Sequence, residues 1–201
     1  MRRVVVFDLG GVLLDWDPRY LYRKLFPGDP AAMEAFLGEV CTVEWNERQD
    51  AGRTFAEAVA ELMPRHEDKR HLIEAFGRRF DEMIPGALDG TVEIVRELKA
   101  RGVPLYALTN WSSETFPAQR VRFPFLDWFD GIVVSGDEGM IKPDLRIFRI
   151  LLDRYRVAAD ESVFIDDNPE NARAASTLGI HGIHFQSPGQ LRRELAALHL
   201  L

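Results

Sequence analysis

Cysteine is almost absent from this chain of 201 residues, which has only Cys41. A disulfide within the chain and a cysteine-built metal site are therefore excluded, and this composition favours a cytoplasmic location. Long hydrophobic runs are also missing. The apolar run before Asp8 has four residues, which is too short for a signal peptide, and no stretch approaches the ~18 apolar residues of a membrane span. We therefore expect a cytoplasmic protein that has no membrane as a partner.

Basic residues are the minority among the charged side chains. The chain has 25 lysines and arginines against 32 aspartates and glutamates, which gives a formal net charge of −7. An acidic protein is repelled by the phosphate backbone, so we expect no nucleic acid among its partners. The hydrophobic fraction of 46% is ordinary for a globular domain, and the length suits one domain with an inserted module.

Short apolar runs, each ending at polar or glycine residues, mark the chain outside residues 16–85. Runs of four to six apolar residues without polar alternation are typical of strands buried on both faces, as in a parallel sheet. Amphipathic helical patterns separate the later runs. This alternation predicts an α/β fold with a Rossmann-like, doubly wound parallel sheet. The predicted strands are residues 4–8, 104–110, 131–136, 162–167 and 179–185.

Residues 16–85 show only helical patterns, and they fall between the first and second predicted strands. We therefore expect a core built from residues 1–15 and 86–201, with residues 16–85 inserted as an α-helical module. Pro85 and Gly86 interrupt the helical pattern at the second junction. The helices predicted within the module are residues 19–26, 31–40, 54–63 and 69–83.

Polar side chains follow four of the predicted strands. Ligands bind at the carboxyl edge of an open parallel sheet, so we expect these side chains to converge on one crevice. Clustered carboxylates repel one another unless a cation lies among them, and an all-oxygen set favours Mg²⁺. A metal ion, a lysine and a threonine hydroxyl together suit a phosphoryl group, with Asp8 as the nucleophile. The converging residues are Asp8, Thr109, Asn110, Lys142, Asp166 and Asp167.

Four short motifs resemble those of the haloacid dehalogenase-like hydrolase superfamily. They are FDLGGVL, LTN, IKPD and FIDDNPEN, and they occur in the family's order at suitable spacing, over essentially the whole chain. Residues 16–85 fall where one branch of the family carries a small helical cap that selects the substrate. The resemblance therefore implies a Rossmann-like hydrolase core, a cap and a Mg²⁺ cofactor.

The motifs also imply a role for each matched residue. Asp8 resembles the nucleophile. Lys142 resembles the lysine that stabilises the nucleophile and the transferring group, and Thr109 is predicted to assist catalysis from the phosphate-binding strand end. The implied metal ligands are Asp8, the backbone carbonyl of Gly10, Asp167 and Asp166.

Two segments are predicted to contact the substrate. The end of the second strand matches the family's phosphate-binding motif, and a tryptophan follows it at the rim of the crevice. In capped members the loop between cap helices faces the active site, and residues 44–55 form a polar stretch between two helical patterns. An ordinary helix–helix connection with a packed tryptophan is an equal alternative for that stretch. The predicted contacts are Thr109, Asn110, Trp111, Trp45 and Gln49.

Gly10 stands where phosphatases of the family usually carry a second aspartate, which acts as general acid and base. Such help is typically worth ~10²–10⁴-fold in rate. The chain is then a phosphatase in which a cap residue or water replaces the acid, a dehalogenase that needs no metal, or a non-catalytic module that binds phosphorylated ligands. The intact pair Asp166 and Asp167 favours phosphate chemistry. We expect Mg²⁺-dependent hydrolysis of a small phosphorylated metabolite, such as a sugar phosphate, through an aspartyl-phosphate on Asp8, by a monomer or homodimer.

Overall fold

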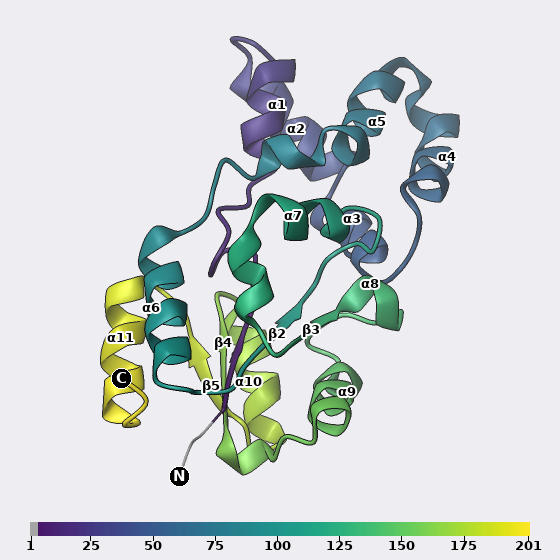
Figure 1. Cartoon of the computed structure of the whole chain (residues 1–201). Coiled ribbons are helices and arrows are strands. Elements are labelled where there is room, and N and C mark those ends of the chain that lie inside the picture. The colour runs from purple at the N-terminus through teal and green to yellow at the C-terminus, as the bar shows by residue number, and fades with distance from the viewer. Residues whose placement is uncertain (1–3) are drawn as a thin grey trace.

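The computed structural model describes residues 4–201, and its centre is a five-stranded parallel sheet (Figure 1). The strand order is β3-β2-β1-β4-β5, so that β1 lies in the middle and the chain winds outward in both directions. The predicted doubly wound α/β fold is confirmed. The strands are β1 (Val4–Phe7), β2 (Leu105–Thr109), β3 (Gly131–Val134), β4 (Ser162–Asp166) and β5 (His181–His184).

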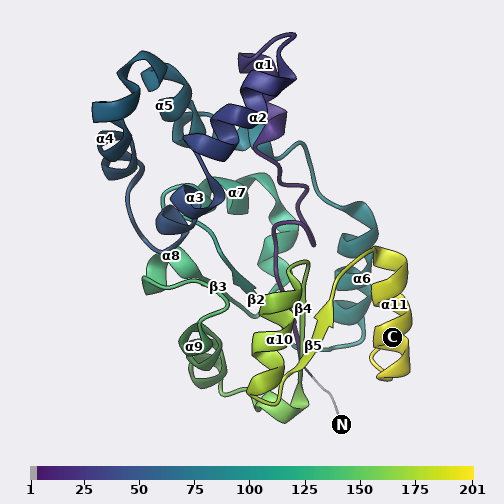
Figure 2. The same cartoon turned by 180° about the vertical axis from the view of Figure 1, so that it is seen from behind.

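Both faces of the sheet are buried, which explains why the strands read as unbroken apolar runs. In β1, Val5 and Phe7 pack into the hydrophobic cluster on one face, while Val6 packs into the cluster on the other. Helices α6 (Asp89–Ala100) and α11 (Pro188–Ala197) pack together on the first face. Helices α9 (Leu145–Tyr155) and α10 (Pro169–Thr177) cover the second face (Figures 1 and 2).

A helical layer lies beyond the end at which β1 leaves the sheet (Figure 1). It is formed by the chain between β1 and β2, and its interior is built from aromatic side chains. The Tyr22 ring lies 5.1 Å from Phe36 and 6.2 Å from Phe76, and its hydroxyl donates to the Leu72 carbonyl at 2.9 Å. The helices of this layer are α1 (Arg19–Leu25), α2 (Pro30–Glu39), α3 (Val43–Asp50), α4 (Phe55–His66) and α5 (Arg70–Arg78).

The helical layer differs from the sequence prediction in two places. Residues 44–55 were predicted as a connection, but most of this segment is helix α3. Thr42 starts the helix, because its side chain accepts a hydrogen bond from the Trp45 backbone N–H at 3.1 Å. The helix predicted over residues 69–83 is broken at Arg79 into α5 and a short 3₁₀ turn.

The remaining elements are short. Across residues 4–201, no helix is both long enough and apolar enough to span a bilayer. The short elements are α7 (Phe116–Arg122), α8 (Ser135–Glu138) and the 3₁₀ turns η1 (Glu67–Lys69), η2 (Phe80–Met83), η3 (Pro124–Trp128) and η4 (Ala159–Glu161).

Candidate active site

Asp8 directly follows the central strand β1, and its side chain is almost completely buried. Its backbone N–H donates to the Ile165 carbonyl at 2.8 Å, which continues the pairing between β1 and β4. Its Oδ1 accepts a hydrogen bond from the Leu9 backbone N–H at 2.7 Å. The carboxylate of Asp8 is therefore held in one orientation at the carboxyl edge of the sheet.

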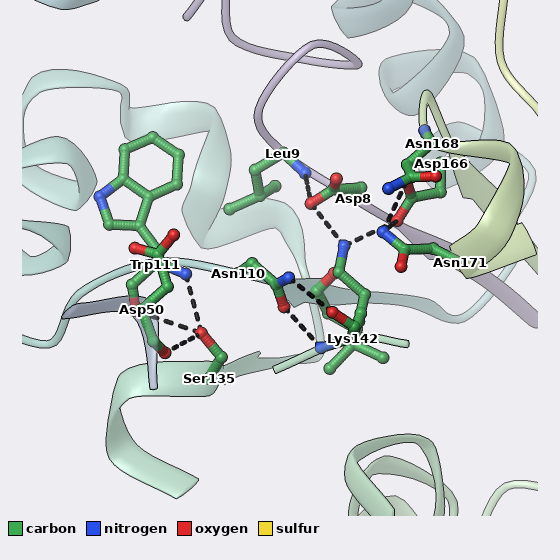
Figure 3. Close-up of polar contacts among 11 residues, drawn as sticks. Asp8, Leu9, Asp50, Asn110, Trp111, Ser135, Lys142, Asp166, Asn168 and Asn171 are labelled. Carbon is green, nitrogen blue, oxygen red and sulfur yellow. Dashed lines mark hydrogen bonds and ion pairs between the residues drawn. The ribbon is translucent and has the colours of Figure 1, made fainter. Parts of the chain in front are cut away.

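Lys142 lies between two carboxylates with its side chain fully buried (Figure 3). Its Nζ is 2.9 Å from Oδ1 of Asp8 and 2.7 Å from Oδ2 of Asp166, and it also donates to the Leu108 carbonyl at 2.9 Å. These three contacts use all three ammonium hydrogens. A buried lysine is tolerated here because two negatively charged carboxylates contact its ammonium group.

Asn110 fixes the backbone of Lys142 by two hydrogen bonds (Figure 3). The Asn110 Nδ2 donates to the Lys142 carbonyl at 3.0 Å, and the Lys142 N–H donates to the Asn110 Oδ1 at 2.8 Å. The end of β2 and the segment after β3 are thereby joined. Since the side-chain amide is used in this way, Asn110 positions Lys142 in addition to lining the cleft.

The charges at the site perturb one another. Burial, together with the charges of Asp166 and Asp167, raises the pKa of Asp8 to about 7, and Lys142 acts in the lowering direction. Burial disfavours the ammonium of Lys142, yet Asp8 and Asp166 raise its pKa above the usual value. Burial and then Asp166 raise the pKa of Asp167. This cluster of three carboxylates and one lysine carries an excess of negative charge, as expected where a cation binds.

Three carboxylates fit a divalent metal ion. Asp8, Asp166 and Asp167 each offer an oxygen, and these oxygens lie within 4.8 Å of one another. The donor set is all oxygen, which suits Mg²⁺ rather than a soft metal. Gly10 lines the cleft beside Asp8, as expected for a backbone ligand. The residues present therefore fit a magnesium ion.

Asp166 and Asp167 differ in how many partners they already have. Asp166 accepts hydrogen bonds from the Asn168 N–H at 2.8 Å and from the Asn171 Nδ2 at 3.1 Å, in addition to the ion pair with Lys142. Asp167 is exposed and faces Gly11. Of the two carboxylates, Asp167 has the freer oxygens.

A cleft of about 380 Å³ opens over these residues, between the sheet edge and the helical layer. The sheet edge contributes Asp8, Lys142 and Asp167, and the layer contributes one face of α3, which carries Glu47 and Asp50. Trp16, Phe80 and Trp111 add apolar surface. The charged and polar lining comprises Asp8, Asn46, Glu47, Asp50, Asn110, Lys142, Asp167, Asn168 and Asn171.

Most of the site residues predicted at the edge of the sheet line this cleft. Asp8, Gly10, Asn110, Trp111, Lys142 and Asp167 all line it, and Asp166 lies behind Lys142. Thr109 is not part of the lining and is 1% exposed. Its hydroxyl makes no hydrogen bond with any residue of the range 4–201, which is unusual for a buried polar group. The contact of Thr109 with a phosphate stays a prediction.

Trp45 and Gln49 do not line the cleft, which corrects their predicted role as substrate contacts. Trp45 packs edge-on against Phe76 at 5.2 Å, inside the helical layer. The Gln49 side chain is fully buried, donates to the Trp45 carbonyl at 2.7 Å and accepts from Arg53 at 2.7 Å. Trp45 therefore packs α3 against α5, and Gln49 links α3 to Arg53 in the segment that follows it.

The opposite face of α3 supplies the lining that the sequence analysis missed. Val43, Asn46, Glu47 and Asp50 follow the spacing i, i+3, i+4, i+7, which places them on one side of a helix. Thr42, a good N-cap residue, was the available signal. With the helix recognised, the periodicity would have directed attention to Asn46 and Asp50.

Comparison with known proteins agrees with the fold and the motifs. The family model described as haloacid dehalogenase-like hydrolase matches residues 2–179. The sesquiterpene phosphatase astK of Aspergillus oryzae is 30% identical, covering 91% of this chain and 89% of its own. A phosphorylated carbohydrates phosphatase of Thermotoga maritima is 26% identical, covering 98% and 93%.

Solved structures support the same fold. A HAD family enzyme of Bacteroides thetaiotaomicron, crystallised with magnesium and inorganic phosphate, is 21% identical, covers 93% of this chain and 96% of its own, and has a TM-score of 0.71. The relatives include phosphatases and dehalogenases. Two are much longer: the chain spans 19% of mouse acyl-CoA dehydrogenase family member 10 and 36% of the drimenol cyclase drtB of Aspergillus calidoustus. With a family model over nearly its whole length, this chain belongs to the haloacid dehalogenase-like hydrolases.

Proposed function

We propose that the chain hydrolyses phosphate monoesters of small metabolites, with Mg²⁺, through an aspartyl-phosphate on Asp8. The observation that carries the proposal is the position of the Asp8 carboxylate. It contacts Lys142 at 2.9 Å and lies within reach of two further carboxylates that fit a cation. A nucleophilic carboxylate with positive charge on two sides is suited to approach an anionic phosphoryl group.

The residues divide the work as follows. An oxygen of Asp8 attacks phosphorus, the bond to the leaving oxygen breaks, and water then cleaves the aspartyl-phosphate. Lys142 offsets the charge that Asp8 and the phosphoryl oxygens bring together. The unpartnered hydroxyl of Thr109 donates to a phosphoryl oxygen. When bound, Mg²⁺ adds positive charge at the transferring group.

Asp167 is the direct acidic ligand in this proposal, with Asp8 and the Gly10 carbonyl. Its carboxylate is exposed to the cleft, whereas the oxygens of Asp166 already bind Lys142 and Asn171. Asp166 then acts mainly by orienting these two partners.

The helical layer of residues 16–85 is proposed as a cap that selects the substrate. It closes the cleft with the polar face of α3, and about 380 Å³ suits a small phosphorylated organic molecule. Polar and aromatic lining together suit a sugar phosphate, and the name of the Thermotoga maritima relative is in line with that class. We further expect the enzyme to act in the cytoplasm.

This geometry supports the dehalogenase alternative less well than it supports the phosphatase. Displacing a halide from carbon needs no metal. Without a cation, burial and then the charges of Asp166 and Asp167 raise the pKa of Asp8, so a smaller fraction of it is present as the nucleophilic carboxylate. The same cluster is useful once a cation is present. A non-catalytic binding module would need no nucleophile aligned with a buried lysine.

The test is phosphate release from an aryl phosphate and a panel of sugar phosphates, with Mg²⁺ and with a chelator. Asp8→Asn is the matched control, because it keeps the shape of the side chain and removes the nucleophile. Release that requires both Mg²⁺ and Asp8 supports the proposal. No release under any condition sinks it, and halide release from 2-haloacids would replace it with the dehalogenase.

A further inference from the structure

Two carboxyl groups in the cleft have no role in the proposed hydrolysis. The titratable groups among the described lining residues are Asp8, Glu47, Asp50, Lys142 and Asp167. The nucleophile, the buried ammonium and the metal ligand account for three of them. Glu47 and Asp50, both on α3, are left. A phosphate ester with a poor leaving group needs a group that donates a proton to the leaving oxygen. Lys142 is not free to do so, because its ammonium contacts two carboxylates. A carboxylate that binds the metal is not free either.

Asp50 is fixed against the sheet edge although it belongs to the helical layer (Figure 3). Its backbone carbonyl accepts a hydrogen bond from the Ser135 hydroxyl, which in turn accepts from the Trp111 N–H at 2.9 Å. Its carboxyl accepts from the Asn46 Nδ2 at 3.0 Å and lies near the Ser112 backbone N–H, which acts to lower its pKa. Ser112 lies two residues after Asn110. The carboxyl is therefore held beside the predicted phosphate-binding strand end.

The surroundings of Asp50 suit a group that both gives and takes a proton. Burial and then the charge of Glu47 raise its pKa to about 7, while Lys142 and the Ser112 N–H act in the lowering direction. A carboxyl with such a pKa is present in both protonation states near neutral pH. Glu47 is more exposed, and burial and then the charge of Glu44 raise its pKa.

We infer that Asp50 is the general acid and base of the reaction, an inference that rests on the proposed phosphatase function. In the first step Asp8 forms the bond to phosphorus, the bond to the leaving oxygen breaks, and that oxygen takes the electron pair and the proton of the Asp50 carboxyl. In the second step the Asp50 carboxylate takes a proton from water as its oxygen attacks phosphorus. The bond to Asp8 breaks, inorganic phosphate leaves, and both carboxyl groups return to their first state.

The test varies the leaving group, which a merely structural role of Asp50 would not sense. Steady-state kcat/KM is measured for aryl phosphates of increasingly poor leaving groups and for an alkyl phosphate, with wild type, Asp50→Asn and Glu47→Gln. Asp50→Asn is expected to lose about 10²–10³-fold on the alkyl phosphate and little on the best aryl phosphate. Glu47→Gln is expected to lose much less than Asp50→Asn on the alkyl phosphate, because it keeps the Asp50 carboxyl and only removes a charge that raises its pKa.

A rescue variant separates loss of the acid from loss of shape. The space beside Gly10 is open, since a Cβ built there meets no atom within 4 Å. Asp50→Asn combined with Gly10→Asp is expected to recover part of the alkyl phosphate rate. An equal loss on every substrate in Asp50→Asn overturns the inference and leaves the phosphatase intact. A wild type that releases no phosphate, or an active Asp8→Asn, overturns the proposed function instead.

Discussion

The α-carbon of Gly11 faces the carboxylate of Asp167 so closely that a methyl group there would overlap its Oδ2. Gly11 also has a φ of +69°, a left-handed conformation that favours glycine. The turn after β1 therefore gives Asp167 the space it occupies. Asp167 is the proposed direct metal ligand. Glycine at position 11 is therefore needed both for the backbone conformation of the turn and for the position of a metal ligand.

Gly11→Ala is expected to weaken Mg²⁺ binding, because the new methyl group displaces the Asp167 carboxylate. The Mg²⁺ concentration for half-maximal phosphate release should rise by about 10-fold or more, a size usual for disturbing the support of a metal ligand. Gly10→Ala is the matched control, since its Cβ has open space and its carbonyl is kept. A Gly11→Ala enzyme with an unchanged Mg²⁺ requirement would remove Asp167 from the metal site.

Lys142→Met is expected to destabilise the fold as well as abolish activity. The substitution keeps the length of the side chain but leaves Asp8 and Asp166 facing each other in a buried site, at a cost of about 3–5 kcal/mol. Lys142 lowers the pKa of Asp8, so its loss raises that pKa further. A group with a raised folded-state pKa loses stability as pH rises.

The free energy of unfolding of Lys142→Met, measured in urea, should therefore fall further below that of the wild type at about pH 8 than at about pH 5. Lys142→Met combined with Asp166→Asn removes one of the two facing charges and should recover part of the loss. A deficit that is independent of pH would mean that packing, rather than charge, makes Lys142 necessary.

The strands, and the polar residues that follow them at the candidate site, could be predicted from the sequence because burial on both faces leaves a local signal. Val4 to Phe7 are predicted as a strand because they are all apolar, and Val5, Val6 and Phe7 are buried. Asp8 is the first polar residue after them. Lys142 could be placed because parallel strands end at one edge. In the sequence, the only sign that Lys142 lies near Asp8 is that each follows a predicted strand.

The lining from the helical layer could not be predicted in the same way. Residues 44–55 are polar, so they lack the apolar stripe that usually marks a helix. Trp45 was predicted to contact the substrate as part of this stretch, but its ring packs against Phe76 in the aromatic interior. Asp50 is placed in the cleft by its proximity to Ser112 and by a hydrogen bond from Ser135. Both residues are more than 60 positions away in the chain, so only the tertiary fold brings them to Asp50.

Asp50→Asn is expected to make the protein more stable than wild type at alkaline pH. The pKa of Asp50 is about 7 in the folded chain and about 3.9 in an unfolded one. Between these values the folded state binds more protons, so this group's contribution to stability falls as pH rises. Relative to wild type, the variant should gain about 1–3 kcal/mol on going from about pH 4 to about pH 8. Thermal unfolding at both pH values measures the difference, and no change in it would mean that Asp50 is an ordinary surface carboxyl.

Asn46 and Trp45 are neighbours in sequence, but Asn46 lines the cleft and Trp45 packs inside the helical layer, so their variants should have separate effects. The Asn46 Oδ1 is buried and accepts no hydrogen bond from the described residues, which suits a hydroxyl group of the substrate. Asn46→Ala should raise KM for a sugar phosphate by about 10-fold, the value of one hydrogen bond, and leave KM for an aryl phosphate nearly unchanged. Trp45→Phe should lower the free energy of unfolding by about 1–2 kcal/mol and change both KM values alike. If Trp45→Phe instead alters the ratio of the two KM values and Asn46→Ala does not, the cleft-facing side of α3 has been assigned to the wrong residues.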